Sequence, residues 1–140
     1  MITFLRALFL VVLASMIWVT SWAGMQCPLF AVPRAVATHP WFIATLCDAY
    51  WGFITFYVWV CYREVSWTAR IAWFLAIVAL GNIAMSSYCL AALLKAPKDG
   101  RLADVLTARR PGPGWLGLSL AAAGIAVTVA AAVQGNHLAQ

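Results

Sequence analysis

The stretch Trp41–Tyr62, WFIATLCDAYWGFITFYVWVCY, decides the class of this protein because it is long and apolar enough to cross a bilayer. A hydrocarbon core roughly 30 Å thick requires about twenty apolar residues in a helix. Three further segments meet the same criterion: Phe4–Ala23, Ile71–Leu94 and Trp115–Val133. Because irregular backbone cannot face lipid, we expect all four segments to be helices.

The composition supports this class. The chain has 140 residues, of which 65% are hydrophobic and 9% charged, and its mean hydropathy is +0.90. Soluble domains are about half apolar and a quarter charged. The sequence therefore predicts an all-α integral membrane protein, a four-helix bundle that forms one transmembrane domain over residues 1–140. A cell membrane or a bacterial inner membrane is the expected location.

The first segment also resembles a secretory signal, because Arg6 precedes its apolar run and Ser21-Trp22-Ala23 imitates a cleavage site. The run is longer than a usual signal core of roughly 7–15 residues. We therefore expect the segment to be retained as the first helix, although the sequence leaves cleavage open.

The basic loop, residues 95–114, is expected to set the orientation. If the chain crosses the membrane four times, the basic loop and Arg34 lie on one side of the membrane. Arg6, Arg63 and Arg70 then lie on the other side. Because positive residues stay on the cytoplasmic side, this count predicts both termini outside, although Arg6 favours the reverse. The loop holds five basic residues: Lys95, Lys98, Arg101, Arg109 and Arg110.

The basic loop also predicts a partner. The net charge of +5 is spread over segments that flank the membrane, so anionic lipid headgroups are a simpler partner than nucleic acid. Leu102, Val105 and Leu106 have helical spacing, and a short interfacial helix or an ordinary basic connector would both fit.

Asp48 is the only acidic residue within Trp41–Tyr62. An acidic side chain inside the membrane is by default a candidate functional residue. Helical geometry places Thr45, Gly52 and Thr55 near Asp48 on one face, and we expect this polar stripe to face the bundle interior. Polar residues of the third expected helix lie at a similar depth in the membrane, so they are candidate hydrogen-bond partners for Asp48. The candidate polar site comprises Asp48, Asn82, Ser86, Thr45 and Thr55.

Two roles for Asp48 remain open. An unpaired carboxylate in hydrocarbon normally takes up a proton. Asp48 would then either donate a hydrogen bond that clasps two helices, or form a proton-coupled or polar-ligand site.

The fourth segment carries small residues at four-residue spacing, which permits close backbone approach to another helix. This candidate packing face would meet its own bundle, a second copy or a larger membrane complex. It consists of Gly117, Ala121, Gly124 and Thr128.

No cofactor or metal is predicted. The four cysteines show neither a C-x-x-C pair nor metal-ligand spacing, and three of them lie within expected helices, where cysteine behaves as a small hydrophobe. They are Cys27, Cys47, Cys61 and Cys89.

The sequence resembles an uncharacterised family of small multi-pass membrane proteins, a domain of unknown function. The resemblance rests on TLCDAYWGFITFYVWVCYRE from Thr45 to Glu64, GNIAM from Gly81 to Met85 and LADVL from Leu102 to Leu106, so it covers roughly residues 40–110. It implies several membrane helices, but it implies no activity. It also supports four residues as positions typical of the family. Those positions are Asp48, Tyr50, Gly52 and Asn82.

Two functions therefore remain. The first is a non-enzymatic structural or accessory subunit of a membrane complex, indicated by the small size and the absence of a catalytic residue set. The alternative is a lipophilic-ligand or proton-linked carrier that uses Asp48 and works as a homo-oligomer, since four short helices enclose little space. An intramembrane isomerase or cyclase would need a second acid or base, and only Asn82 stands near.

Overall fold

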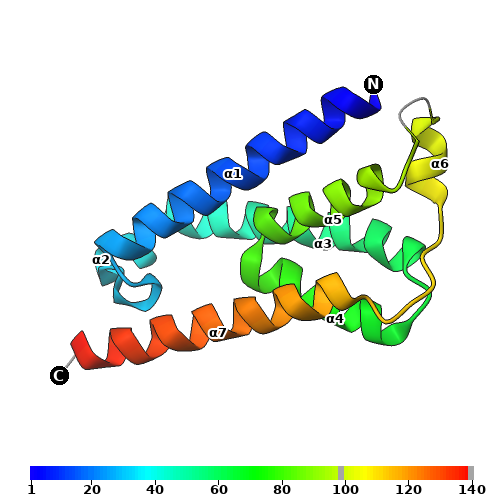
Figure 1. The fold of residues 1–140 in the computed structure, drawn as a ribbon. Coiled ribbons are helices and arrows are strands. Elements are labelled where there is room, and N and C mark those ends of the chain that lie inside the picture. The colour runs from blue at the N-terminus through cyan, green and yellow to red at the C-terminus, as the bar shows by residue number, and fades with distance from the viewer. Residues whose placement is uncertain (98–99, 139–140) are drawn as a thin grey trace.

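The computed structural model describes residues 1–97 and 100–138, with residues 135–138 described for their backbone alone. Within these residues the chain is all-helical (Figure 1). Three helices are long and apolar enough to cross a membrane: α1 (Ile2–Gln26), α3 (Pro40–Arg63) and α7, whose apolar part is Trp115–Gln134. At 1.5 Å per residue, each is long enough for a core of roughly 30 Å.

The prediction that Ile71–Leu94 forms a third membrane-crossing helix is wrong. Two shorter helices occupy this part of the chain, α4 (Trp67–Leu80, 14 residues) and α5 (Asn82–Leu94, 13 residues). Each is only about 20 Å long, too short to cross the hydrocarbon. The described residues therefore do not form the expected bundle of four crossings.

The two short helices form a hairpin that returns to the end from which it started (Figure 1). The rings of Trp73 and Tyr88 lie 4.8 Å apart. In one continuous helix these residues would be separated by about 22 Å along the axis. Their contact shows that α4 and α5 are antiparallel.

Gly81 makes the reversal. It caps the C-terminus of α4 and the N-terminus of α5, with φ 53° and ψ −125°. This left-handed region is open to glycine and costly for other residues. Its N–H donates to Ile77 and its carbonyl accepts from Met85, so the turn leaves neither group unpaired.

The hairpin fills the space between the long helices at one end of the molecule. α7 runs beside α4 in the same direction, because Gly117 lies against Trp73 and Gly124 against Ala79. α1 runs beside α5, where the Arg6 guanidinium donates to the carbonyls of Leu93 and Ala96 at 2.7 Å. The core between α3, α4, α5 and α7 includes Val60, Trp73, Ile77, Ala84, Tyr88 and Ala121.

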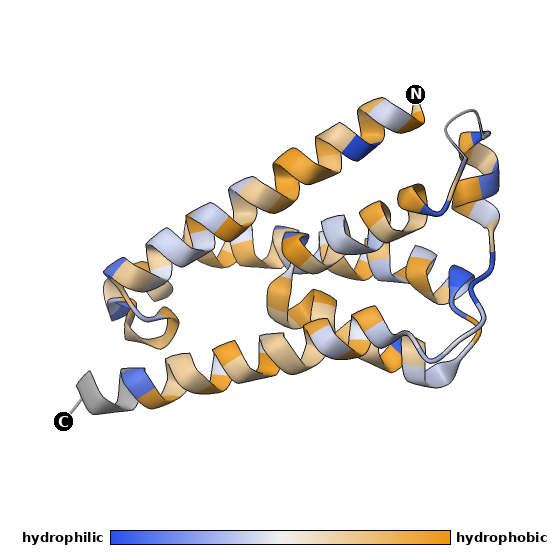
Figure 2. Cartoon of the chain, in the orientation of Figure 1, coloured by the Kyte–Doolittle hydropathy of each residue, from blue (hydrophilic) through white to orange (hydrophobic). Residues whose placement is uncertain are grey.

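Short elements connect the long helices. A 3-10 turn, η1 (Leu29–Ala31), and α2 (Arg34–Ala37) lie between α1 and α3. α6 (Leu102–Thr107) lies in the basic loop. A short helix was one of the two alternatives predicted for this loop. Hydrophilic segments gather at the ends of the molecule, and the helices between them are mainly apolar (Figure 2).

The hairpin also changes the expected orientation. The start of α1 and the end of α7 lie at opposite ends of the molecule (Figure 1), so the expectation of both termini on one side is wrong. Arg63 and Arg70 lie at the same end as the basic loop, because Arg63 donates to Ala108 and accepts from the backbone of Arg110. Arg6 contacts the end of α5 at this end too. We call this end of the molecule the basic end. Arg34 lies at the opposite end, and Lys98 falls outside the described residues.

Candidate functional site

The predicted polar stripe of α3 lies on the outside of the chain. Thr45, Asp48, Gly52 and Thr55 are all exposed. Both threonine hydroxyls donate to carbonyls of their own helix, four residues earlier. The expectation that this stripe faces the bundle interior is therefore wrong for the single chain.

Helical geometry explains this orientation. Phe53 is the α3 residue that meets the hairpin tip, since a Cβ at Gly81 would lie 2.7 Å from its ring. Asp48 precedes Phe53 by five residues, which turns it about 140° around the axis and moves it about 7.5 Å further from the basic end. The inner face of α3 is instead aromatic, with Phe53, Phe56, Tyr57 and Trp59 packed against the core.

The other predicted polar residues are separated from Asp48. Asn82 is exposed at the hairpin tip, and Ser86 is buried one turn further along α5. The structure therefore does not bring the candidate polar site together as one cluster.

The small residues of α7 lie against α4. Gly117, Ala121 and Gly124 are buried, while Thr128 is exposed and donates to Gly124. A Cβ at Gly117 would lie 2.9 Å from the Trp73 indole nitrogen, and one at Gly124 would lie 2.7 Å from Ala79. The chain therefore uses most of this face for its own packing.

A buried polar cluster lies at the basic end, and it was not among the sites predicted from the sequence. Glu64 and Arg63 are buried, with exposed fractions of 3% and 2%. The Tyr88 hydroxyl and the Glu64 carboxyl group share a hydrogen bond of 3.0 Å. The Arg70 side chain holds the Glu64 carbonyl at 2.8 Å. Residues from α3, α4 and α5 thus meet at one point.

Two arginines enclose Tyr88. The guanidinium carbons of Arg63 and Arg110 lie 5.5 and 5.4 Å from its ring centre. Arg110 also donates to Ala91 on α5 and pairs by its backbone with Arg63 and Val65. Such cation–π contacts strengthen when they are shielded from water.

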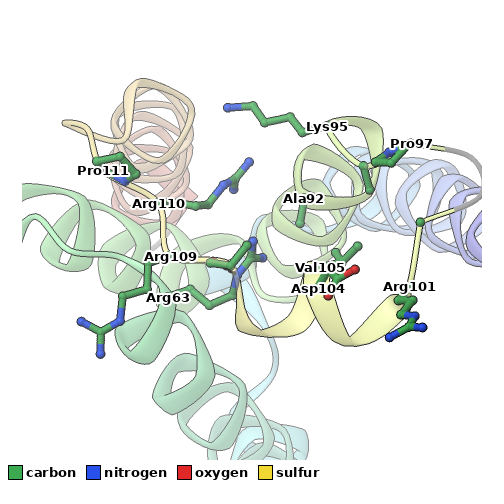
Figure 3. A pocket seen from close by; sticks show the side chains of 13 residues that line it. Arg63, Ala92, Lys95, Pro97, Arg101, Asp104, Val105, Arg109, Arg110 and Pro111 are labelled. Atoms are coloured by element: carbon green, nitrogen blue, oxygen red, sulfur yellow. Dashed lines mark hydrogen bonds between the residues drawn. The ribbon is translucent and has the colours of Figure 1, made fainter.

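A cavity of about 370 Å³ opens beside this cluster (Figure 3). Its polar lining includes five basic side chains and one acidic side chain: Arg63, Lys95, Arg101, Arg109, Arg110 and Asp104. A second cavity of about 320 Å³ shares Lys95 and Arg110 with it. Asp48 lines neither cavity.

The sequence contained one signal for this cluster. Arg63 and Glu64 are adjacent charged residues directly after an apolar run, and Tyr88 interrupts the next one. A continuous helix over Ile71–Leu94 separates Tyr88 from Arg63, so the cluster becomes recognisable only when the chain reverses at Gly81.

Within residues 1–97 and 100–134, whose side chains the structure describes, no three His, Cys, Asp or Glu side chains gather closely enough to hold a metal ion. The four cysteines are free thiols.

A family model described as "Protein of unknown function (DUF1475)" matches residues 1–110. The match includes α1, for which the sequence offered no specific resemblance, and ends before α7. Neither the curated proteins nor the solved structures contain a significant match.

Proposed function

Because the chain belongs to the DUF1475 family, whose function is unknown, we propose its role from the arrangement of its own residues: it is a non-catalytic accessory subunit of a membrane-protein complex. The outer face of α3 is the surface that binds the partner. We define this face by Thr45, Asp48, Gly52 and Thr55, which are exposed.

The exposure of Asp48 is the observation that supports this role most directly. Its position eight residues from Pro40 places it about 12 Å inside the 24-residue helix α3. Ionisable side chains at such depth face protein or water, because facing lipid is costly. This chain leaves Asp48 on its surface, so a second protein is the simplest cover.

The partner is expected to supply a hydrogen-bonding side chain opposite Asp48. Gly52, where an added Cβ would meet nothing within 4 Å, allows a neighbouring helix to approach closely. A symmetric pair of this chain would bring two Asp48 carboxyl groups together. A different membrane protein with a polar helix therefore suits this face better than a second copy.

The carrier alternative receives less support. A carrier that uses Asp48 needs a cavity beside it, and both described cavities lie at the basic end. The small face of α7 is also less suitable as a docking surface than expected, since Gly117 and Gly124 already contact α4.

Site-specific photocrosslinking in the membranes of the native host tests the proposal. A photoreactive phenylalanine replaces Thr55 on the outer face of α3. The matched control carries it at Val127, which is 63% exposed on the apolar surface of α7. We expect a discrete product with one other membrane protein from position 55, and none from position 127.

Asp48→Leu should abolish this product, while Asp48→Asn, which still forms hydrogen bonds, should retain part of it. A product of twice the chain mass would identify a homo-oligomer and overturn the accessory role. The absence of any product from position 55 would remove the α3 face as a docking surface.

A further inference from the structure

A buried charged donor without an acceptor lies at the basic end. The Arg63 Nε donates to the Ala108 carbonyl at 3.0 Å, and the guanidinium lies 5.1 Å from the centre of the Trp59 ring system. Its Nη1 is buried and has no hydrogen-bond partner among the described residues. Buried polar groups are nearly always paired, and an unpaired charged group carries the full cost of its desolvation.

Arg63 lines the cavity of about 370 Å³, together with four further cationic side chains (Figure 3). These come from separate elements: Lys95 follows α5, Arg101 precedes α6, and Arg109 and Arg110 follow it. Asp104 is the acidic side chain among the described residues of the lining. With these described groups ionised, positive charges outnumber the negative charge, so the cavity favours an anion.

The remaining lining indicates which anion. Guanidinium groups bind phosphate oxygens through parallel hydrogen bonds, and several cations can share one phosphate. Ala92, Val105 and Pro97 also line the cavity and give it an apolar part. The cavity lies at the ends of three membrane-length helices, the depth at which lipid headgroups are found. A phosphate group attached to an apolar body matches both parts of the lining.

We propose that this cavity is a phosphate-binding site, in which Arg63 Nη1 donates to a phosphate oxygen and Lys95 and Arg101 supply further positive charge at its exposed rim. An anionic glycerophospholipid is the expected source of the phosphate. This site is separate from the outer face of α3, so it does not depend on the proposed docking role.

The test uses the rim residues. Arg63 also supports the backbone of Ala108, so its replacement could disrupt the fold, whereas Lys95 and Arg101 are exposed. The test variant is Lys95→Ala with Arg101→Ala, and the control is Arg34→Ala at the opposite end. The full chain is reconstituted in nanodiscs of phosphatidylcholine with or without phosphatidylglycerol. Native mass spectrometry then counts the retained lipids, and circular dichroism confirms folding.

We expect the unaltered protein and the Arg34→Ala variant to retain one phosphatidylglycerol in preference to phosphatidylcholine. Each cation near a membrane surface contributes about 1 kcal/mol, a roughly fivefold change in affinity, so the double variant should bind about 25-fold more weakly. Equal retention by the double variant and the control would overturn the site.

A second arm separates the two sources of phosphate. Inorganic phosphate is added to the protein in a neutral detergent, and thermal unfolding is followed. Stabilisation by inorganic phosphate without lipid preference, lost in the double variant, would keep the site and overturn the lipid as its source. No response to either ligand would overturn the proposal.

Discussion

Tyr88 is the residue on which the basic end depends. It is fully buried, its hydroxyl is hydrogen-bonded to Glu64, and its ring contacts Trp59 and Trp73 edge-on at 5.4 and 4.8 Å. Because Glu64 is itself buried, the hydroxyl satisfies a carboxyl group that has little access to water. One side chain thus joins the end of α3 to both arms of the hairpin.

We expect Tyr88→Phe to lower the free energy of unfolding by about 1.5–3 kcal/mol, the range for hydrogen bonds to charged groups. The ring contacts remain, so the loss reports the hydroxyl alone. Unfolding by sodium dodecyl sulfate in mixed micelles, followed by tryptophan fluorescence, measures it. Tyr62→Phe is the control, because Tyr62 is 52% exposed; an equal effect of the two variants would contradict the role of the Glu64–Tyr88 bond.

The α4–α5 hairpin depends on Gly81. We expect Gly81→Ala to destabilise the protein by at least about 2 kcal/mol, because a positive-φ conformation costs about 1–3 kcal/mol in other residues and overpacking costs a similar amount. The added Cβ would lie 2.7 Å from the Phe53 ring. The same unfolding experiment in mixed micelles measures the change.

Gly24→Ala is the matched control for this prediction. Gly24 lies within α1, and an added Cβ there would meet nothing within 4 Å. Since alanine favours the helix over glycine by roughly 0.5–1 kcal/mol, this variant should be slightly more stable. A Gly81→Ala protein as stable as Gly24→Ala would show that the reversal does not require glycine.

The long helices were predictable from the sequence because hydropathy alone identifies them. Phe4–Ala23, Trp41–Tyr62 and Trp115–Val133 each fall within a helix of membrane length. The hairpin was not predictable in this way, since Ile71–Leu94 is mainly apolar and contains no charged residue, and hydropathy carries no information on chain direction. A glycine with positive φ inside an apolar run looks the same as one that continues the helix.

The candidate sites could be predicted only in part, for a related reason. The α7 residues Gly117 and Gly124 were recognised as a packing face from their spacing alone. The polar stripe containing Asp48 was correctly placed on one face of α3, but periodicity does not tell which face meets the core. That choice is made by Phe53 and the neighbouring aromatic residues, which pack against the hairpin.

At the scale of the whole molecule, the hairpin brings the positive charges together at the basic end. Arg6, Arg63, Arg70 and the described cations of the basic loop share the basic end, opposite Arg34. Positive residues are retained in the cytoplasm, so we expect the basic end and the N-terminus inside and the C-terminus outside.

Cysteine labelling tests this arrangement. Single cysteines replace Val65, Thr107 or Thr38 in a chain whose four native cysteines are changed to alanine. A membrane-impermeant maleimide is then applied to sealed vesicles of one orientation. Positions 65 and 107 should react alike and position 38 oppositely, whereas four crossings would place positions 65 and 107 on opposite sides. Opposite reactivity at those two positions would contradict the hairpin.

The hairpin also gives the protein an uneven cross-section. Among the described residues, α4, α5 and α6 lie at the basic end beside parts of α1, α3 and α7, and α4 and α5 end before the other half of the molecule (Figure 1). In a bilayer the chain would displace more lipid from one leaflet than from the other. A wedge of this kind fits best where the leaflet at the basic end is stretched, so membrane curvature itself would influence where the protein gathers.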